Sequence, residues 1–249
     1  MRCCCPLSTP FARAFFSIVA ICAVSIIAAG FVRADDKPAP KPVKSQPYPL
    51  ATCIVSGKSL GDKPVVKQID SREVRFCCDQ CPTKFESDKA AYFKKIDAQI
   101  VEQQLKHYPL TTCVVMPDDE LNAPDINVNY VSANRLVRFC CPDCIKAFNA
   151  DPAKYFTKID EAVIKQQKDA YPLDTCPVSG EKLGGMGEPV TKVYGVAMVK
   201  FCCNGCVAKF ETDYTTYMAK VTDAWKAKHA SGDDHGHDHS HDGHDHPHN

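Results

Sequence analysis

The chain has 249 residues, of which 24% are charged and 45% hydrophobic, and its 30 basic residues are balanced by 30 acidic ones. A net charge of zero without a concentrated basic stripe gives no electrostatic support to nucleic-acid binding. The sequence contains 16 cysteines, and 12 of them lie in motifs that recur along the chain. These motifs are the main guide to both fold and function.

Residues 1–34 have the features of an export signal. Arg2 and Arg13 precede an apolar run from Ala14 to Phe31, and a small-residue cleavage pattern ends at Ala34. Cleavage there predicts an exported protein, periplasmic or secreted, without a stable membrane span. The alternative is an N-terminal membrane anchor, because the run is long for a signal core but short for a spanning helix.

Residues 35–47 contain four prolines and no apolar periodicity. Such a composition predicts an extended linker, which we expect to be a spacer and not a functional site.

The rest of the chain is a tandem repeat. A Tyr-Pro-Leu motif begins at residues 48, 108 and 171, so its copies are separated by 60 and 63 residues. This spacing predicts three modules, at 48–107, 108–170 and 171–230. A unit of about 60 residues buries little apolar surface and usually needs a metal or a disulfide to stabilise it.

Each module is predicted to contain a β-hairpin followed by a helix, which makes the fold class α+β. Expected strand pairs are 65–69 with 73–77, about 128–131 with 136–140, and 190–194 with 196–201. In module one the helical pattern begins at Lys84 and ends before Pro109. Module two differs by a polar and acidic insertion at 117–127.

Aromatic and aliphatic residues follow the helical period in every module and are predicted to form its core. In chain order they are Tyr92, Phe93, Ile96 and Ile100; Phe148, Tyr155, Phe156, Ile159 and Val163; and Phe210, Tyr217, Met218, Val221 and Trp225.

Each module also carries a lone cysteine and a Cys-Cys-x-x-Cys motif, with 23 to 26 residues between them. A hairpin would return the lone cysteine to the pair, and the last cysteine would lie at a helix start, where the dipole favours thiolate. Four sulfurs could then converge on a tetrahedral site for Zn(II) or Cu(I), about one ion per module. The predicted ligands are Cys53, Cys77, Cys78 and Cys81; Cys113, Cys140, Cys141 and Cys144; and Cys176, Cys202, Cys203 and Cys206.

The sequence allows two roles for the second cysteine of each adjacent pair. Ser56, Met116 and Ser179 occupy the turn position where many zinc knuckles place another cysteine. Either the second cysteine supplies the fourth ligand, or each site has three thiolates and is open to ligand exchange, as a carrier or sensor requires.

The order Cys, hairpin, Phe-Cys-x-x-x-Cys, x-x-x-Phe and a tyrosine-containing helix resembles the YHS/TRASH type of cysteine-rich domain, over nearly all of residues 48–228. This resemblance implies three treble-clef-like modules that bind heavy metals, as in proteins of metal trafficking, resistance or sensing. It also implies a smaller ligand set: Cys53, Cys77 and Cys81; Cys113, Cys140 and Cys144; and Cys176, Cys202 and Cys206.

Two other functional classes compete with metal binding. An exported protein with an even number of cysteines fits a disulfide-stabilised binding or structural protein, although adjacent cysteines are poorly placed to pair with each other. The Cys-x-x-Cys motifs at predicted helix starts are also found in thiol-disulfide oxidoreductases, but the expected βαβ framework is absent from the pattern.

Residues 231–249 form a histidine-rich tail with no apolar residue, which predicts disorder. Its imidazoles could bind additional Zn, Ni or Cu ions. The candidate ligands are His235, His237, His239, His241, His244, His246 and His248. His107 is expected to be a surface or capping residue. The whole sequence predicts an exported, non-enzymatic protein that binds metal ions; it identifies no protein partner.

Overall fold

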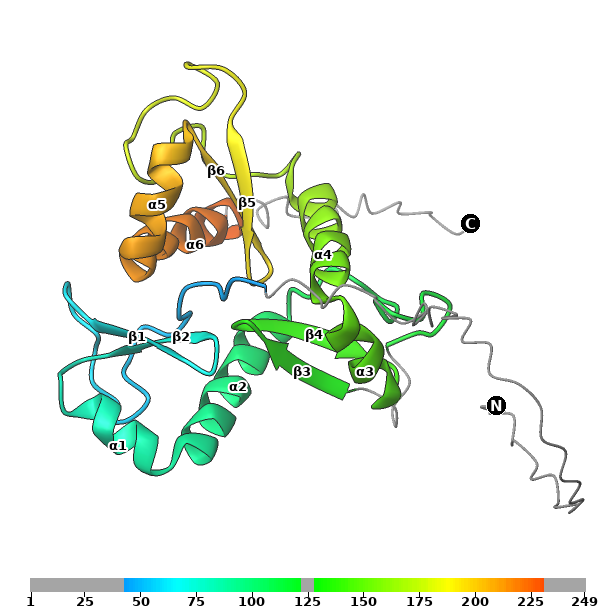
Figure 1. Cartoon of the computed structure of the whole chain (residues 1–249). Helices are drawn as coiled ribbons and strands as arrows, with labels where there is room; N and C mark the ends of the chain where they lie inside the picture. Colours follow the sequence, from blue (N-terminus) through cyan, green and yellow to red (C-terminus); the bar gives the residue numbers. More distant parts are fainter. Residues whose placement is uncertain (1–42, 122–127, 231–249) are drawn as a thin grey trace, which may run out of the picture. The chain divides into compact units, whose positions relative to one another are not determined.

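A computed structural model describes residues 43–121 and 128–230, which belong to one compact unit of the chain (Figure 1). The predicted export segment, most of the linker and the histidine-rich tail lie outside these residues. The described part is mixed α/β and consists of three hairpin-plus-helix units, as the sequence predicted.

Each unit contains a two-stranded antiparallel sheet after the turn of its lone cysteine. The pairs are β1 (Val65–Ile69) with β2 (Arg72–Phe76), β3 (Val128–Ser132) with β4 (Arg135–Phe139), and β5 (Val190–Tyr194) with β6 (Ala197–Phe201). Asp70 and Ser71 both have positive φ, 49° and 63°, as the central residues of a type I′ turn require. The third hairpin has a glycine, Gly195, at φ 59° in its turn.

Two helices follow each hairpin, where the sequence predicted one. They are α1 (Cys81–Ser87) and α2 (Lys89–Leu105), α3 (Asp143–Ala150) and α4 (Pro152–Gln167), and α5 (Asn204–Thr212) and α6 (Tyr214–Ala230). An aspartate lies at each break. The Asp88 side chain accepts a hydrogen bond from the amide of Ala91, and so acts as the N-cap of α2.

The predicted aromatic core is confirmed. In each module a phenylalanine at the end of the second strand meets a phenylalanine of the short helix edge to face, with ring centroids 5.1–5.6 Å apart. These pairs are Phe76–Phe85, Phe139–Phe148 and Phe201–Phe210. A tyrosine of the long helix lies against the second ring of each pair.

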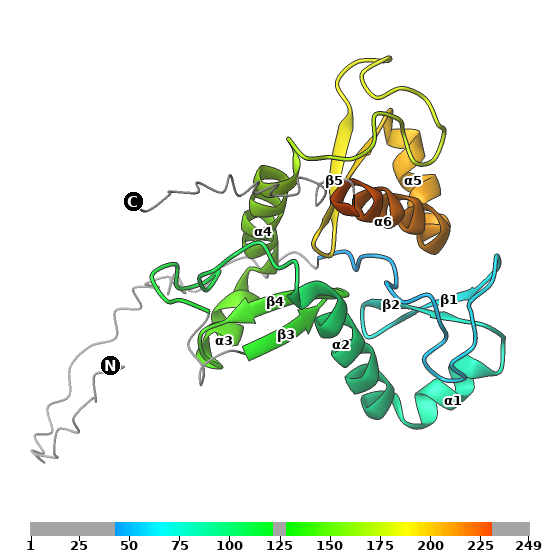
Figure 2. The same ribbon diagram turned by 180° about the vertical axis from the view of Figure 1, so that it is seen from behind.

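The long helix of one module supports the hairpin of the next. Helix α2 packs against β3 and β4, and α4 packs against β5 and β6 (Figures 1 and 2). At the end of α2, buried Gln104 accepts a hydrogen bond from the Leu136 amide at 2.9 Å. Gln167 at the end of α4 does the same for the Met198 amide at 2.8 Å. The modules are therefore joined by hydrogen bonds from strand amides to glutamine side chains of the preceding helix.

The end of the predicted linker is part of this packing, so its prediction as a mere spacer was wrong for residues 44–47. Ser45 is buried and its hydroxyl accepts the Glu73 amide, the position served by Gln104 and Gln167 in the later hairpins. Gln46 donates from Nε2 to the Val193 carbonyl at 2.8 Å. A segment before module one thus provides the contact that a preceding helix provides elsewhere.

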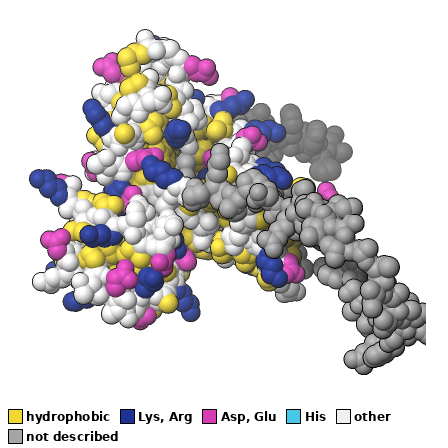
Figure 3. Space-filling view, viewed as in Figure 1, with side chains coloured by type: hydrophobic (Ala, Val, Ile, Leu, Met, Phe, Trp, Pro, Cys, Tyr) yellow, Lys and Arg dark blue, Asp and Glu magenta, His cyan; other side chains and the backbone are white. Residues whose placement is uncertain are grey.

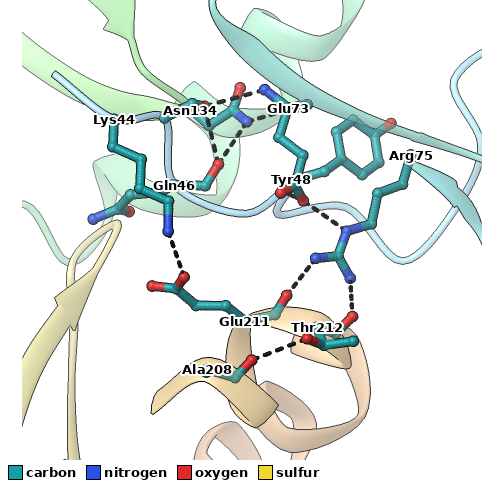
Figure 4. A network of polar contacts seen from close by, with 10 residues as sticks. Lys44, Gln46, Tyr48, Glu73, Arg75, Asn134, Ala208, Glu211 and Thr212 are labelled. Carbon is teal, nitrogen blue, oxygen red and sulfur yellow. Dashed lines mark hydrogen bonds and ion pairs between the residues drawn. The ribbon is translucent and has the colours of Figure 1, made fainter. Parts of the chain in front are cut away.

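Arg75 connects modules one and three (Figure 4). Its buried guanidinium donates to Glu73 at 2.7 Å and to the carbonyls of Glu211 and Thr212, at 2.5 and 3.0 Å. Those carbonyls belong to the last turn of α5, where a helix lacks internal donors and favours a cation.

No helix in the described part of the chain is long and apolar enough to cross a membrane. On the face shown in Figure 3, basic and acidic side chains are interspersed over the described residues.

Candidate metal centres

Three cysteines converge in each module. The groups are Cys53, Cys77 and Cys81; Cys113, Cys140 and Cys144; and Cys176, Cys202 and Cys206, and within each group all sulfurs lie within 4.8 Å of one another. Eight of these nine residues are buried, and Cys77 is partly exposed. Ligands of a tetrahedral zinc ion with Zn–S bonds of about 2.3 Å would be about 3.8 Å apart. Each group could therefore hold one metal ion.

Local structure explains the convergence. In module one, the amide of Cys53 donates to the Lys58 carbonyl at 2.8 Å, which closes a tight turn around the lone cysteine. Cys77 directly follows β2, and Cys81 is the first residue of α1, which brings their sulfurs to 3.8 Å. Modules two and three give 3.7 and 3.6 Å for the equivalent pair. The hairpin and the helix start thus bring together three of the four sulfurs that were predicted to converge.

The second cysteine of each adjacent pair lies at the edge of its centre. Its sulfur contacts the sulfur of the helix cysteine, which is Cys81, Cys144 or Cys206. The distances are 3.4 Å for Cys78, 3.6 Å for Cys141 and 3.9 Å for Cys203, but none of these three belongs to a mutually close group. Cys78 is exposed and the other two are partly exposed. This geometry matches the three-sulfur ligand set better than four converging sulfurs, and it places an accessible thiol beside each centre.

All twelve described cysteines are free thiols. A disulfide requires an S–S distance of about 2.05 Å, whereas the sulfur contacts within the centres measure 3.4–4.0 Å. The pairing required by the disulfide alternative is absent from this part of the chain.

The lone cysteines are poised to ionise. Burial opposes ionisation of Cys53, but the Cys77 amide, the Ser56 hydroxyl and nearby turn amides outweigh it and lower its pKa to about 7. For Cys176 the same balance of burial and donors lowers the pKa to about 6. The pKa of Cys113 is also lowered against the effect of burial, by amides that include that of Cys140.

The helix cysteines behave differently from the sequence prediction, which expected the helix start to stabilise their thiolates. Burial, followed by contacts with neighbouring thiols, raises the pKa values of Cys81, Cys144 and Cys206 to about 12. Amides at the helix start instead help to lower the pKa values of the edge cysteines Cys141 and Cys203. The helix start thus stabilises the thiolate of the edge cysteine, and not that of the helix cysteine for which we predicted it.

In every module a polar side chain lies against the return-strand cysteine, which is the residue directly after the second strand: Cys77, Cys140 or Cys202. The hydroxyls of Ser56 and Ser179 lie 3.1 and 3.3 Å from the sulfurs of Cys77 and Cys202. Module two has no such serine, and the side chain of Met116 is half exposed.

In module two the neighbour is a carboxylate, because Cys140 Sγ donates to Asp119 Oδ2 at 3.2 Å. Burial, followed by this hydrogen bond, raises the pKa of Cys140. Sequence reasoning missed Asp119 as a site residue. The acidic insertion was the only signal, and nothing in its composition distinguished Asp119 from Asp118 or Glu120.

His107 lies just beyond α2 and is exposed, as expected of a surface residue. The histidines of the tail lie outside the described residues. Comparisons with protein-family models, with curated proteins and with solved structures found no match. The proposed function therefore depends on the geometry of the three centres.

Proposed function

We propose that this protein binds about three thiophilic metal ions, one per module, and acts in metal sequestration, trafficking or resistance outside the cytoplasm. The observation that supports this best is the threefold recurrence of a buried cysteine group with sulfurs within 4.8 Å. A single such group could be incidental to packing, but three copies built in the same way from a hairpin and a helix start favour one function shared by the three modules.

The donor set favours Zn(II) or Cu(I). Thiolates are soft ligands that suit these ions better than Ca(II) or Mg(II). The lone cysteines Cys53 and Cys176, with pKa values of about 7 and 6, would lose a proton at low cost near neutral pH. An incoming ion would then displace the protons of the other thiols.

An accessible thiol beside each centre supports a role in metal exchange. Cys78 is exposed and lies 3.4 Å from Cys81 Sγ, so it could contact an ion without being one of the three enclosed ligands. A three-coordinate site with a free thiol at its edge allows an acceptor to take the ion by stepwise ligand replacement.

Several parts of the proposal rest on the sequence alone. Export depends on residues 1–34, accessory binding of Zn, Ni or Cu depends on the tail, and membership of the YHS/TRASH type depends on the cysteine and aromatic spacing. We interpret the Cys-x-x-Cys motifs as part of metal-binding sites and not as catalytic dithiols.

Native mass spectrometry of the reduced protein tests the proposal. We expect about three Zn(II) or Cu(I) ions in a chain ending at Ala230, and additional ions in the longer chain that retains the tail. Cys81→Ser should remove one equivalent, whereas the neighbouring Cys78→Ser should retain it because the triad remains. A metal-free protein with six disulfides would contradict the proposal.

A further inference from the structure

The centre of module two differs from the other two in its turn. The amide of the lone cysteine donates to the carbonyl of the fifth residue beyond it in modules one and three, and to that of the sixth, Asp119, in module two. The extra residue replaces a serine hydroxyl beside the return-strand cysteine with the carboxylate of Asp119.

The backbone holds this carboxylate at the edge of the centre. The Asp119 carbonyl accepts the Cys113 amide at 2.8 Å, and the Asp119 amide donates to the Met116 carbonyl at 3.0 Å. Its side chain is exposed, so rotation about its own side-chain bonds meets little resistance. Asp119 is not among the atoms that all lie within 4.8 Å of one another, so coordination requires its side chain to turn further toward the rest of the triad.

The present distance is close to what coordination requires. With Zn–S near 2.3 Å and Zn–O near 2.1 Å, sulfur and oxygen ligands of a tetrahedral ion lie about 3.6 Å apart. The Cys140 Sγ to Asp119 Oδ2 distance is 3.2 Å, bridged by the thiol proton. Replacing that proton by a metal ion requires only a small separation of the two atoms.

We propose that Asp119 is the fourth ligand of the module-two centre and makes that centre selective for a divalent, zinc-like ion over Cu(I). The proposal rests on the metal-binding function inferred above. Loading would release the protons that the three thiols still hold, including the one shared by Cys140 and Asp119, and would form three metal–sulfur bonds and one metal–oxygen bond.

Charge and ligand type both support this selectivity. Three thiolates and a carboxylate carry four negative charges, so a divalent ion leaves two uncompensated and a monovalent ion leaves three. Carboxylate oxygen is also a common ligand of zinc and a poor one for Cu(I). The exposed neighbours Asp118 and Glu120 add to the negative field without contacting the sulfurs in the structure.

Cadmium-113 NMR of the complete reduced chain provides the test, because its chemical shift reports the number of sulfur ligands at each site. Cys144→Ser identifies the module-two resonance by its loss. Asp119→Asn, which keeps size but removes the charge, should then move that resonance and weaken Zn(II) binding there at least about tenfold. Asp118→Asn is the matched control: it removes the same charge without removing a ligand, so it should leave the resonance in place and weaken Zn(II) binding far less than Asp119→Asn.

A parallel anaerobic titration with Cu(I) distinguishes a lost ligand from a damaged fold. Asp119→Asn should leave Cu(I) binding by the module-two triad within about twofold, and an equal loss for both ions would overturn the proposal. An unchanged cadmium resonance would also overturn it, while three bound equivalents would leave the general function intact. If Cys144→Ser removed no cadmium, the metal-binding function itself would fail for module two.

Discussion

At the residue scale, the thiols of one centre differ widely in acidity although they lie within a few ångströms of one another. The lone cysteine lies where turn amides point at its sulfur, which stabilises a thiolate even in a buried position. Burial, and after it contact with the other thiols, makes a negative charge on the helix cysteine costly and raises its pKa. Before metal binding, each centre therefore favours one thiolate and keeps its helix thiol protonated.

This difference predicts the pH dependence of the metal-free protein. Cys53 and Cys176 have folded-state pKa values of about 7 and 6 against a usual value of 9.0, so the unfolded chain binds more protons between these limits and stability should rise with pH. Cys81 and Cys206, with pKa values of about 12, reverse the sign above pH 9. We expect maximum stability near pH 9.

Urea unfolding of the reduced, metal-free protein from pH 6 to pH 11 measures this effect. Cys176→Ser should flatten part of the rise below pH 9, and Cys206→Ser part of the fall above it. A stability that is constant from pH 6 to pH 9 would contradict the low pKa values of the lone cysteines.

At the element scale, the sequence predicted the hairpins and the convergence of the cysteines because both depend on local pattern. Alternating strands and a two-residue turn fix a hairpin register, and the register fixes where Cys77 emerges. The helix break was missed, although Asp88 and the pair Asp151-Pro152 carried its signal. Aspartate at an N-cap and proline in the first turn are strong start signals inside an otherwise continuous apolar period.

The N-cap role of Asp151 predicts a measurable loss of stability. Its side chain accepts the Lys154 amide at 3.3 Å at the start of α4. Asp151→Ala should lower the free energy of unfolding by about 1 kcal/mol. Asp169→Ala, at an exposed position just after α4, is the control and should cost less than about 0.5 kcal/mol. Equal effects in chemical denaturation would show that the cap contributes nothing.

At the scale of the whole described chain, the three modules are not structurally independent. Val193 and Met198 of the third hairpin belong to the same apolar cluster as Phe139 and Phe148 of module two. Arg135 of β4 is buried and donates to the Gly195 carbonyl at 3.2 Å. These contacts depend on how modules meet, which no local pattern within one module encodes, so the sequence could not predict them.

The same reasoning explains why residues 44–47 were misjudged. A proline-rich composition is typical of a linker, and the buried hydroxyl of Ser45 and the hydrogen bonds of Gln46 arise only when modules one, two and three are assembled around them. Because the modules share such contacts, loss of metal from one centre should also lower the stability of the neighbouring modules.

Arg75 gives the clearest test of this assembly. Arg75→Ala would remove the ion pair of Glu73, whose side chain is only 15% exposed. It would also remove the hydrogen-bond donor of the last two carbonyls of α5. Removing one partner of a buried ion pair typically costs about 3–5 kcal/mol, so we expect the free energy of unfolding to fall by about 3 kcal/mol, in a single cooperative urea transition.

Lys200 is the matched control. It occupies the same position of its hairpin as Arg75 but makes an exposed contact at 3.5 Å, so Lys200→Ala should lower the free energy of unfolding by less than about 1 kcal/mol. If Arg75→Ala cost no more than this control, or split the transition without lowering the stability of module three, the contact between modules one and three would not stabilise the fold.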